Sequence, residues 1–61
     1  MSDMITFELD NGVTVQQYRY AKISIVSLTP AGWHQRKLFS YEVEVGMYIP
    51  DGDRLRRIER I

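Results

Sequence analysis

The chain has 61 residues and no cysteine, and its eight basic residues balance its eight acidic ones. This length predicts one small domain over residues 1–61, near the lower limit at which a core supports itself. The composition excludes disulfides, and a single histidine leaves a structural zinc ion short of its usual ligands.

The charge balance and the short apolar runs exclude further classes. Balanced charge removes the simplest argument for a protein that binds nucleic acid or a membrane surface. No charged segment leads into an apolar run at the N-terminus, so no signal peptide is expected, and no apolar run is long enough to cross a bilayer. We therefore expect no membrane association and a cytoplasmic location, or the host cytoplasm or virion for a phage-encoded protein.

Three clusters of turn-forming residues divide the chain, at positions 10–12, 29–32 and 50–52. Asn-Gly and Asp-Gly tolerate positive φ, and proline presets φ for the first central position of a turn. The segments between the clusters are rich in valine, isoleucine and aromatic residues, which favour strands. The pattern predicts an antiparallel sheet.

The first strand is predicted at residues 4–9, followed by the Asn-Gly turn. A three-residue loop that ends in a left-handed glycine pairs Leu9 with Val13 and Phe7 with Val15. A two-residue loop would direct both valines to the opposite face. A slip of one residue exchanges the two faces, so the apolar pattern favours the three-residue loop.

The second predicted strand, residues 13–28, is unusually long, and its apolar pattern changes phase along the way. Val15 and Ile23 share one face, whereas Val26 shares the other face with Tyr20. A strand of this kind must bend or bulge, so we expect the sheet to curl.

The third predicted strand, residues 35–49, has the clearest period of two. A loop over residues 29–33 would place Ile23 opposite Phe39 and would leave the second strand at the centre of a meander. The side chains expected to face the core are Phe39, Tyr41, Val43, Val45, Met47 and Ile49.

The C-terminal segment, residues 54–60, allows two interpretations. Leu55, Ile58 and Ile61 are spaced at three, as in a helix, but arginines would crowd the positive end of the helix dipole. As a fourth strand after a three-residue loop, the segment would bring Leu55 to Met47, with a bulge to turn Ile58 inward. The predicted fold class is all-β, a small antiparallel meander of three to four strands (about 4–9, 13–28, 35–49 and, as the fourth, 54–60) that is curled or barrel-like, with a short C-terminal helix as the alternative.

No set of residues predicts catalysis. His34 titrates near neutral pH, and the hydroxyl of Ser27 or Thr29 could lie near it, but no spacing marks a nucleophile, a base and an orienting group. A solvated histidine after a turn is the simpler interpretation.

The paired carboxylates also have simple interpretations. Asp51 and Asp53 occupy a hairpin tip without the further oxygen ligands that calcium or magnesium requires. Glu42 and Glu44 are predicted on the polar face of an open sheet, an environment that does not favour acid–base chemistry. We therefore expect no enzyme, no catalytic residue, no metal and no cofactor.

The outer face of the predicted sheet carries Tyr18, Tyr20 and Tyr48. Tyrosines beside basic residues resemble a stacking platform for single-stranded nucleic acid. The same register places Glu44 opposite Tyr18 and Glu42 opposite Tyr20, where carboxylates would repel phosphates. Tyrosine rims are equally typical of protein interfaces.

The alternative hypothesis, that the protein binds nucleic acid, depends on its basic residues. They could contact phosphates, or they could pair with nearby acids and protect a sheet edge from unwanted pairing. These residues are Lys22, Arg36, Lys37, Arg54, Arg56, Arg57 and Arg60.

Trp33 directly follows a turn glycine and is the best candidate for an interface hot spot. Alternatively, its ring folds over Val26, Leu28 and Leu38 and covers a second small core. The sequence leaves both interpretations open.

The leading hypothesis is a small non-enzymatic protein-interaction or assembly module that forms homo-oligomers. An accessory, inhibitor or structural component encoded by a phage would have this size. The alternative is a nucleic-acid-binding mini-barrel that uses surface tyrosines and arginines. The residues expected to bind a protein partner are Trp33, His34, Tyr18, Tyr20 and Tyr48.

Overall fold

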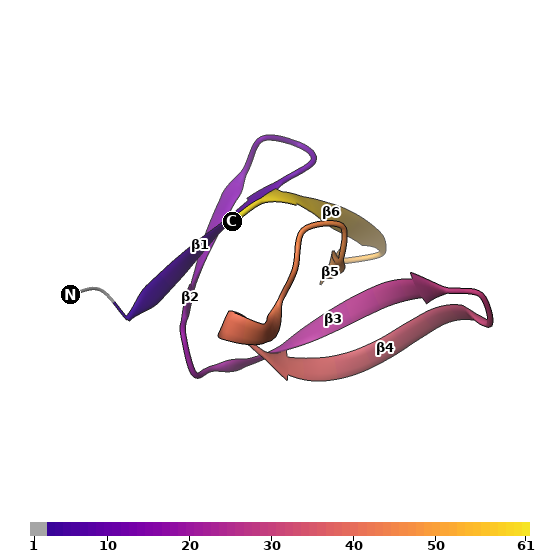
Figure 1. Ribbon diagram of the computed structural model, residues 1–61. Coiled ribbons are helices and arrows are strands. Elements are labelled where there is room, and N and C mark those ends of the chain that lie inside the picture. The colour runs from indigo at the N-terminus through magenta and orange to yellow at the C-terminus, as the bar shows by residue number, and fades with distance from the viewer. Residues whose placement is uncertain (1–2) are drawn as a thin grey trace.

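The computed structural model describes residues 3–61 (Figure 1). Six strands form one antiparallel sheet in the order β2-β1-β6-β5-β3-β4. Within this part of the chain, no helix is long and apolar enough to cross a membrane. The elements are β1 (Met4–Leu9), β2 (Thr14–Tyr18), β3 (Lys22–Thr29), β4 (Gly32–Phe39), the 3₁₀ turn η1 (Ser40–Glu42), β5 (Tyr48–Asp51) and β6 (Arg54–Arg60).

The all-β class is confirmed, and the sheet curls without closing, because β2 and β4 each pair on one side only. Its strand order is not the predicted meander. Strand β6 pairs with both β1 and β5, so the C-terminal strand joins two hairpins that are far apart in the sequence. Figure 1 shows these hairpins, β1–β2 and β3–β4, diverging from each other with β6 crossing between them.

A small core lies where β1, β3 and β6 meet the segment after η1. Phe7, Ile25 and Ile58 are fully buried there, and Leu9 and Val43 are nearly so. One core of this size must stabilise the whole chain, which is the situation expected near the lower limit of domain size.

The first hairpin is confirmed in its details. The Leu9 N–H donates to the Val13 carbonyl at 2.9 Å, and Phe7 pairs with Val15. Gly12 has a φ of +83°, and the Asn11 Oδ1 accepts a hydrogen bond from the Val13 N–H at 3.0 Å. The apolar pattern therefore identified both the loop length and the register.

The single strand predicted over residues 13–28 is wrong. It divides into β2 and β3 at a turn in which the Ala21 N–H donates to the Tyr18 carbonyl at 3.1 Å. The break at residues 19–21 lies before the point at which the apolar pattern changes phase, between Ile25 and Val26. Val15 and Ile25 would share a face of one straight strand but would lie about 33 Å apart on it, so the chain must turn between them for both to reach the same core.

The continuous strand predicted over residues 35–49 is also wrong, because β4 ends at Phe39 and η1 follows directly. The carboxylate of Glu42 accepts a hydrogen bond from the Phe39 N–H at 3.0 Å, which stabilises the turn. Farther along, Gly46 has a φ of +95°, a conformation that no regular strand contains.

This interruption changes which side chains are inside. Val43 is buried as predicted, but Tyr41 and Val45 are exposed. Alternation of apolar and polar residues is typical of a half-buried strand. A segment with this pattern can still form a turn when one of its side chains binds the backbone locally.

The β3–β4 hairpin has a two-residue loop instead of the predicted loop over residues 29–33. Thr29 pairs with Gly32, and the Thr29 Oγ1 donates to the Gly32 carbonyl at 2.9 Å and accepts from the Ala31 N–H at 3.2 Å. Every predicted pair is therefore displaced by one residue, so Ile23 lies opposite Leu38 and not opposite Phe39.

The C-terminal segment is a strand with the predicted bounds 54–60, and the helical alternative is wrong. Its register differs, because the loop from β5 has two residues and pairs Tyr48 with Arg57. Leu55 thus lies opposite Pro50 and not opposite Met47. A bulge lies between β1 and β6, where the register shifts next to Ile58.

Candidate binding surfaces

The β3–β4 hairpin projects from the rest of the molecule (Figure 1), which measures 39 × 22 × 19 Å. The half of this hairpin near the β2–β3 turn and η1 packs into the core through Ile25, with Ile23 and Leu38 against it. The half near the tip extends into solvent and carries large apolar side chains. We call the β3–β4 hairpin the arm.

An apolar patch covers the outer face of the arm near its tip. Leu28 and Trp33 are register partners and are 64% and 55% exposed. The ring of Trp33 meets the ring of Tyr48 edge-on, with 5.1 Å between centroids, and Tyr48 is the register partner of Val26, which is only 7% exposed. Leu28, Trp33 and Tyr48, with Val26 beneath them, form the Trp33 patch.

Both interpretations of Trp33 are therefore partly represented. The indole contacts Tyr48, the register partner of the buried Val26, and yet more than half of the residue faces solvent. Leu38 does not belong to this cluster, because its register position places it on the opposite, core-facing side of β4.

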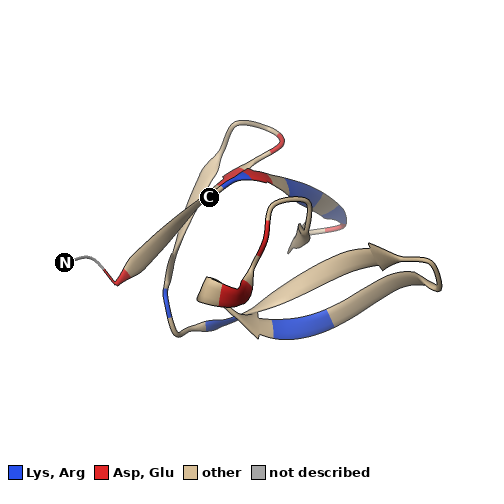
Figure 2. Cartoon of the chain, viewed as in Figure 1, with Lys and Arg blue, Asp and Glu red and all other residues tan. Residues whose placement is uncertain are grey.

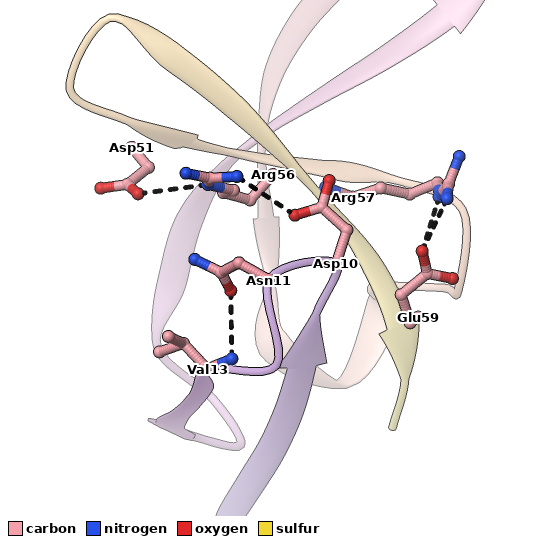
Figure 3. A network of polar contacts seen from close by, with 7 residues as sticks. All are labelled: Asp10, Asn11, Val13, Asp51, Arg56, Arg57 and Glu59. Atoms are coloured by element: carbon pink, nitrogen blue, oxygen red, sulfur yellow. Dashed lines mark hydrogen bonds and ion pairs between the residues drawn. The ribbon is translucent and has the colours of Figure 1, made fainter.

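Charges of both signs border the Trp33 patch. Arg57 pairs with Tyr48 in the sheet, and its guanidinium donates to the Glu59 Oε1 from Nε at 3.0 Å and from Nη2 at 2.6 Å (Figure 3). The Glu59 carboxylate raises the pKa of Arg57, and the Tyr48 hydroxyl contributes in the same direction. The Arg57 guanidinium is therefore a positive charge that Glu59 holds in place at the border of the Trp33 patch, which we call its rim.

A second aromatic cluster lies at the other end of the arm. Tyr41 stacks on Phe39 with centroids 5.6 Å apart and meets Tyr20 edge-on at 5.7 Å. The Lys22 ammonium lies 5.1 Å from the centre of the Phe39 ring. Glu42 caps the same turn, so a carboxylate stands beside these rings.

The predicted tyrosine platform is thus not one surface. Tyr20 and Tyr48 belong to clusters at opposite ends of the arm. Tyr18 lies on β2, is exposed, and makes no ring contact within residues 3–61. The predicted pairings of these tyrosines with Glu42 and Glu44 assumed a continuous strand that does not exist.

The C-terminal arginines are divided between paired and unpaired residues. The Arg56 guanidinium lies 3.6 Å from carboxylate oxygens of both Asp10 and Asp51, and the Asp10 carboxylate also accepts from the Arg57 N–H (Figure 3). Arg54 and Arg60 make no ion pair within the described chain. Two of the four arginines therefore hold the ends of β1, β5 and β6 together.

Charge is segregated along the chain although the total is zero. All eight acidic residues lie outside residues 11–41, whereas four of the eight basic residues lie inside that segment. Figure 2 shows basic positions on the β2–β3 turn and on β4, with an acidic position at η1 next to them. The basic residues of this segment are Arg19, Lys22, Arg36 and Lys37.

His34 lies opposite Ser27 in the β3–β4 register and is exposed. The Ser27 hydroxyl is buried and has no hydrogen-bond partner among the described residues, while the Thr29 hydroxyl is engaged in the turn. The Asp51 carboxylate pairs with Arg56. Within residues 3–61, no three potential metal-ligating side chains gather at one point.

The sequence did not predict two features of these surfaces. Leu28 was predicted only beneath the Trp33 ring in a second small core and not as its exposed register partner, because the predicted register placed Leu28 opposite His34. Phe39 and Tyr41 were predicted to be inside, so their cluster with Tyr20 was not foreseen. The turn residues Thr29 and Gly32, and the position of Glu42 three residues after Phe39, are the local signals that could have revealed both.

Comparisons with known proteins add no constraint: no family model, no curated protein and no solved structure matches the chain.

Proposed function

We propose that the chain is a small non-enzymatic protein-interaction module that assembles with a second copy of itself through the Trp33 patch. The observation that carries this proposal is the half-exposed indole on a projecting hairpin, next to the exposed side chain of Leu28. Tryptophan is the residue most typical of interface hot spots, where it fills a desolvated site.

The size of the molecule supports assembly. Its solvent-accessible surface is 4466 Å², whereas a monomer of this mass typically exposes roughly 4,100 Å². A standard interface removes about 800 Å² from each partner. That area requires the outer face of the arm near its tip and the rim of Arg57 and Glu59, in addition to the exposed Leu28 and Trp33 and the half-buried Tyr48. Burial of this surface would add stability that the small core does not provide.

The distribution of charge favours face-to-face packing over edge-to-edge pairing. The free edge of β4 carries Arg36 and Lys37 and no acidic residue, so two β4 strands side by side would oppose like charges. The rim of the Trp33 patch contains both Arg57 and Glu59. A two-fold axis through the patch would let the cation of one copy approach the carboxylate of the other.

Sedimentation velocity over a range of protein concentrations tests the proposal. We expect a monomer–dimer equilibrium in the native chain. Trp33→Ala should weaken the dimer about a thousandfold, because each of the two copies loses a hot-spot side chain that contributes roughly 2 kcal/mol. Circular dichroism should show that the variant keeps its sheet, because the indole is more than half exposed.

Tyr18→Ala is the matched control, since Tyr18 is an aromatic residue of similar exposure outside the patch. It should leave the dimerisation constant unchanged. A native chain that stays monomeric at the highest concentration, or a Trp33→Ala variant that dimerises as the native chain does, would contradict the proposal.

A further inference from the structure

The sheet contains a groove at the core-proximal half of the arm, away from the Trp33 patch. Strands β3 and β5 share one register pair within the described chain, Val26 with Tyr48, and they separate on the side of Lys22 and Pro50. The groove between them has a volume of about 510 Å³, which is within the range typical of ligand sites. Its lining residues are Val15, Gln17, Lys22, Ile23, Ser24, Lys37, Ile49 and Pro50.

The rim of the groove is positive. Lys22 and Lys37 line it from β3 and β4, and no carboxylate is among its lining residues. The cation–π contact with Phe39 holds the Lys22 ammonium at the surface of the arm. These two lysines belong to residues 11–41, the segment that lacks acidic residues (Figure 2). An occupant with negative charge would complement this rim.

The floor of the groove is aliphatic. Val15, Ile23 and Ile49 are partly buried and pack against the core cluster, and Pro50 closes one side. No aromatic ring lines the groove, so it offers no stacking surface of the kind that single-stranded nucleic acid requires. Aliphatic side chains above such a floor would be better accommodated than bases.

The backbone around the groove suits an extended ligand. Residues 22–25 of β3 pair with β4 on one side and have no paired strand on the β5 side within the described chain. A peptide strand that adds to an open sheet edge gains main-chain hydrogen bonds, and its alternate side chains point to opposite faces. One set of side chains would meet the aliphatic floor, and the other would reach the lysines.

We infer that this groove binds an acidic peptide segment in extended conformation, with aliphatic side chains on Val15, Ile23 and Ile49 and carboxylates at Lys22 and Lys37. The site is separate from the Trp33 patch, so one copy of the chain can hold a second copy and an acidic segment of another protein at the same time. The inference goes beyond self-assembly and does not require it.

Fluorescence anisotropy with a labelled peptide of alternating glutamate and valine tests this site at low ionic strength. Binding should weaken as salt rises, because exposed charge pairs are screened. The double variant Lys22→Gln, Lys37→Gln should bind about tenfold more weakly, as expected for the loss of two exposed ion pairs of ordinary strength.

The matched control is the double variant Arg54→Gln, Arg60→Gln. It removes the same charge from two residues that do not line the groove and make no ion pair in the described chain, so its affinity should stay within about twofold of the native value. Circular dichroism of both double variants verifies that the sheet is retained. Binding of the peptide to Trp33→Ala should equal binding to the native chain, which separates this site from the dimer interface.

Two further probes decide between occupants. A peptide of alternating lysine and valine should not bind, and single-stranded oligothymidine should bind more weakly than the acidic peptide. The inference is wrong if oligothymidine binds and the acidic peptide does not, if neither probe binds, or if both double variants bind the acidic peptide equally well.

Discussion

The two hairpins of this molecule use similar residues for different purposes. The β1–β2 hairpin turns Phe7 and Leu9 into the core, where they are 0% and 6% exposed. The β3–β4 hairpin buries Ile25 near its base but leaves Leu28 and Trp33 more than half exposed near its tip. Both hairpins therefore contribute apolar side chains to the core, and the second also presents large apolar side chains to solvent near its tip.

This difference follows from where each hairpin meets the rest of the sheet. Strand β1 pairs with β6 across the core, whereas β3 pairs with β5 at Val26 alone and then departs from it. Because β5 begins at Tyr48, opposite Val26, residues 27–29 of β3 have no paired strand on that side within residues 3–61. The apolar face at this end of the arm is the surface that we propose for self-association, because large exposed apolar patches are typical of interaction sites.

The largest expected loss of stability is at Phe7, in the core of the first hairpin. Phe7→Ala should lower the free energy of unfolding by about 3–5 kcal/mol, since it leaves a cavity in the core. That loss is comparable to the total stability expected for a chain of this length. At a protein concentration well below the dimerisation constant, Leu28→Ala on the arm should change stability by no more than about 0.5 kcal/mol. Urea denaturation followed by circular dichroism measures both, and equal losses would remove the distinction between the hairpins.

A smaller effect concerns the loop that fixes the first hairpin. Gly12→Ala should cost about 1–2 kcal/mol, because a φ of +83° is unfavourable for a residue with a Cβ. None of the described atoms lies within 4 Å of the added Cβ, so the cost is conformational and not steric. The same denaturation experiment measures it. A neutral result would mean that the loop adopts another conformation in solution.

A smaller loss of stability is expected at the base of the arm, where β4 ends and η1 begins. Glu42→Ala should cost about 1 kcal/mol, because the Phe39 N–H loses its acceptor at the start of η1. Glu44→Ala is the control, since its exposed carboxylate makes no hydrogen bond or ion pair in the described chain, and it should be nearly neutral. Thermal melts of the two variants compare them directly. Equal melting temperatures would show that the cap contributes nothing.

The sequence predicted the first hairpin well and the second poorly for physical reasons. In β1–β2 the apolar pattern and the Asn-Gly turn agree, so only one register buries both Phe7 and Leu9. In the arm, exposed residues such as Gln35 and Lys37 carry no burial pattern, and the register depends on the hydrogen bonds of Thr29. A one-residue error there could not be detected from hydrophobicity.

The interruption after Phe39 was missed for a related reason. The apolar residues from Phe39 to Ile49 alternate as a strand would, but Glu42 binds the backbone locally and Gly46 adopts a positive φ. The candidate site was predicted in part: Trp33 and Tyr48 do contact each other, whereas Tyr18 and Tyr20 lie elsewhere. Contacts between distant segments depend on strand order, which local patterns do not specify.

Trp33 is the only tryptophan, so its fluorescence reports on the central claim without labelling. Emission spectra recorded over a wide range of protein concentration would follow the environment of this one ring. We predict a shift to shorter wavelength as concentration rises, with the midpoint at the dimerisation constant measured by sedimentation. Dimerisation with an unchanged emission maximum would show that the copies meet through another surface.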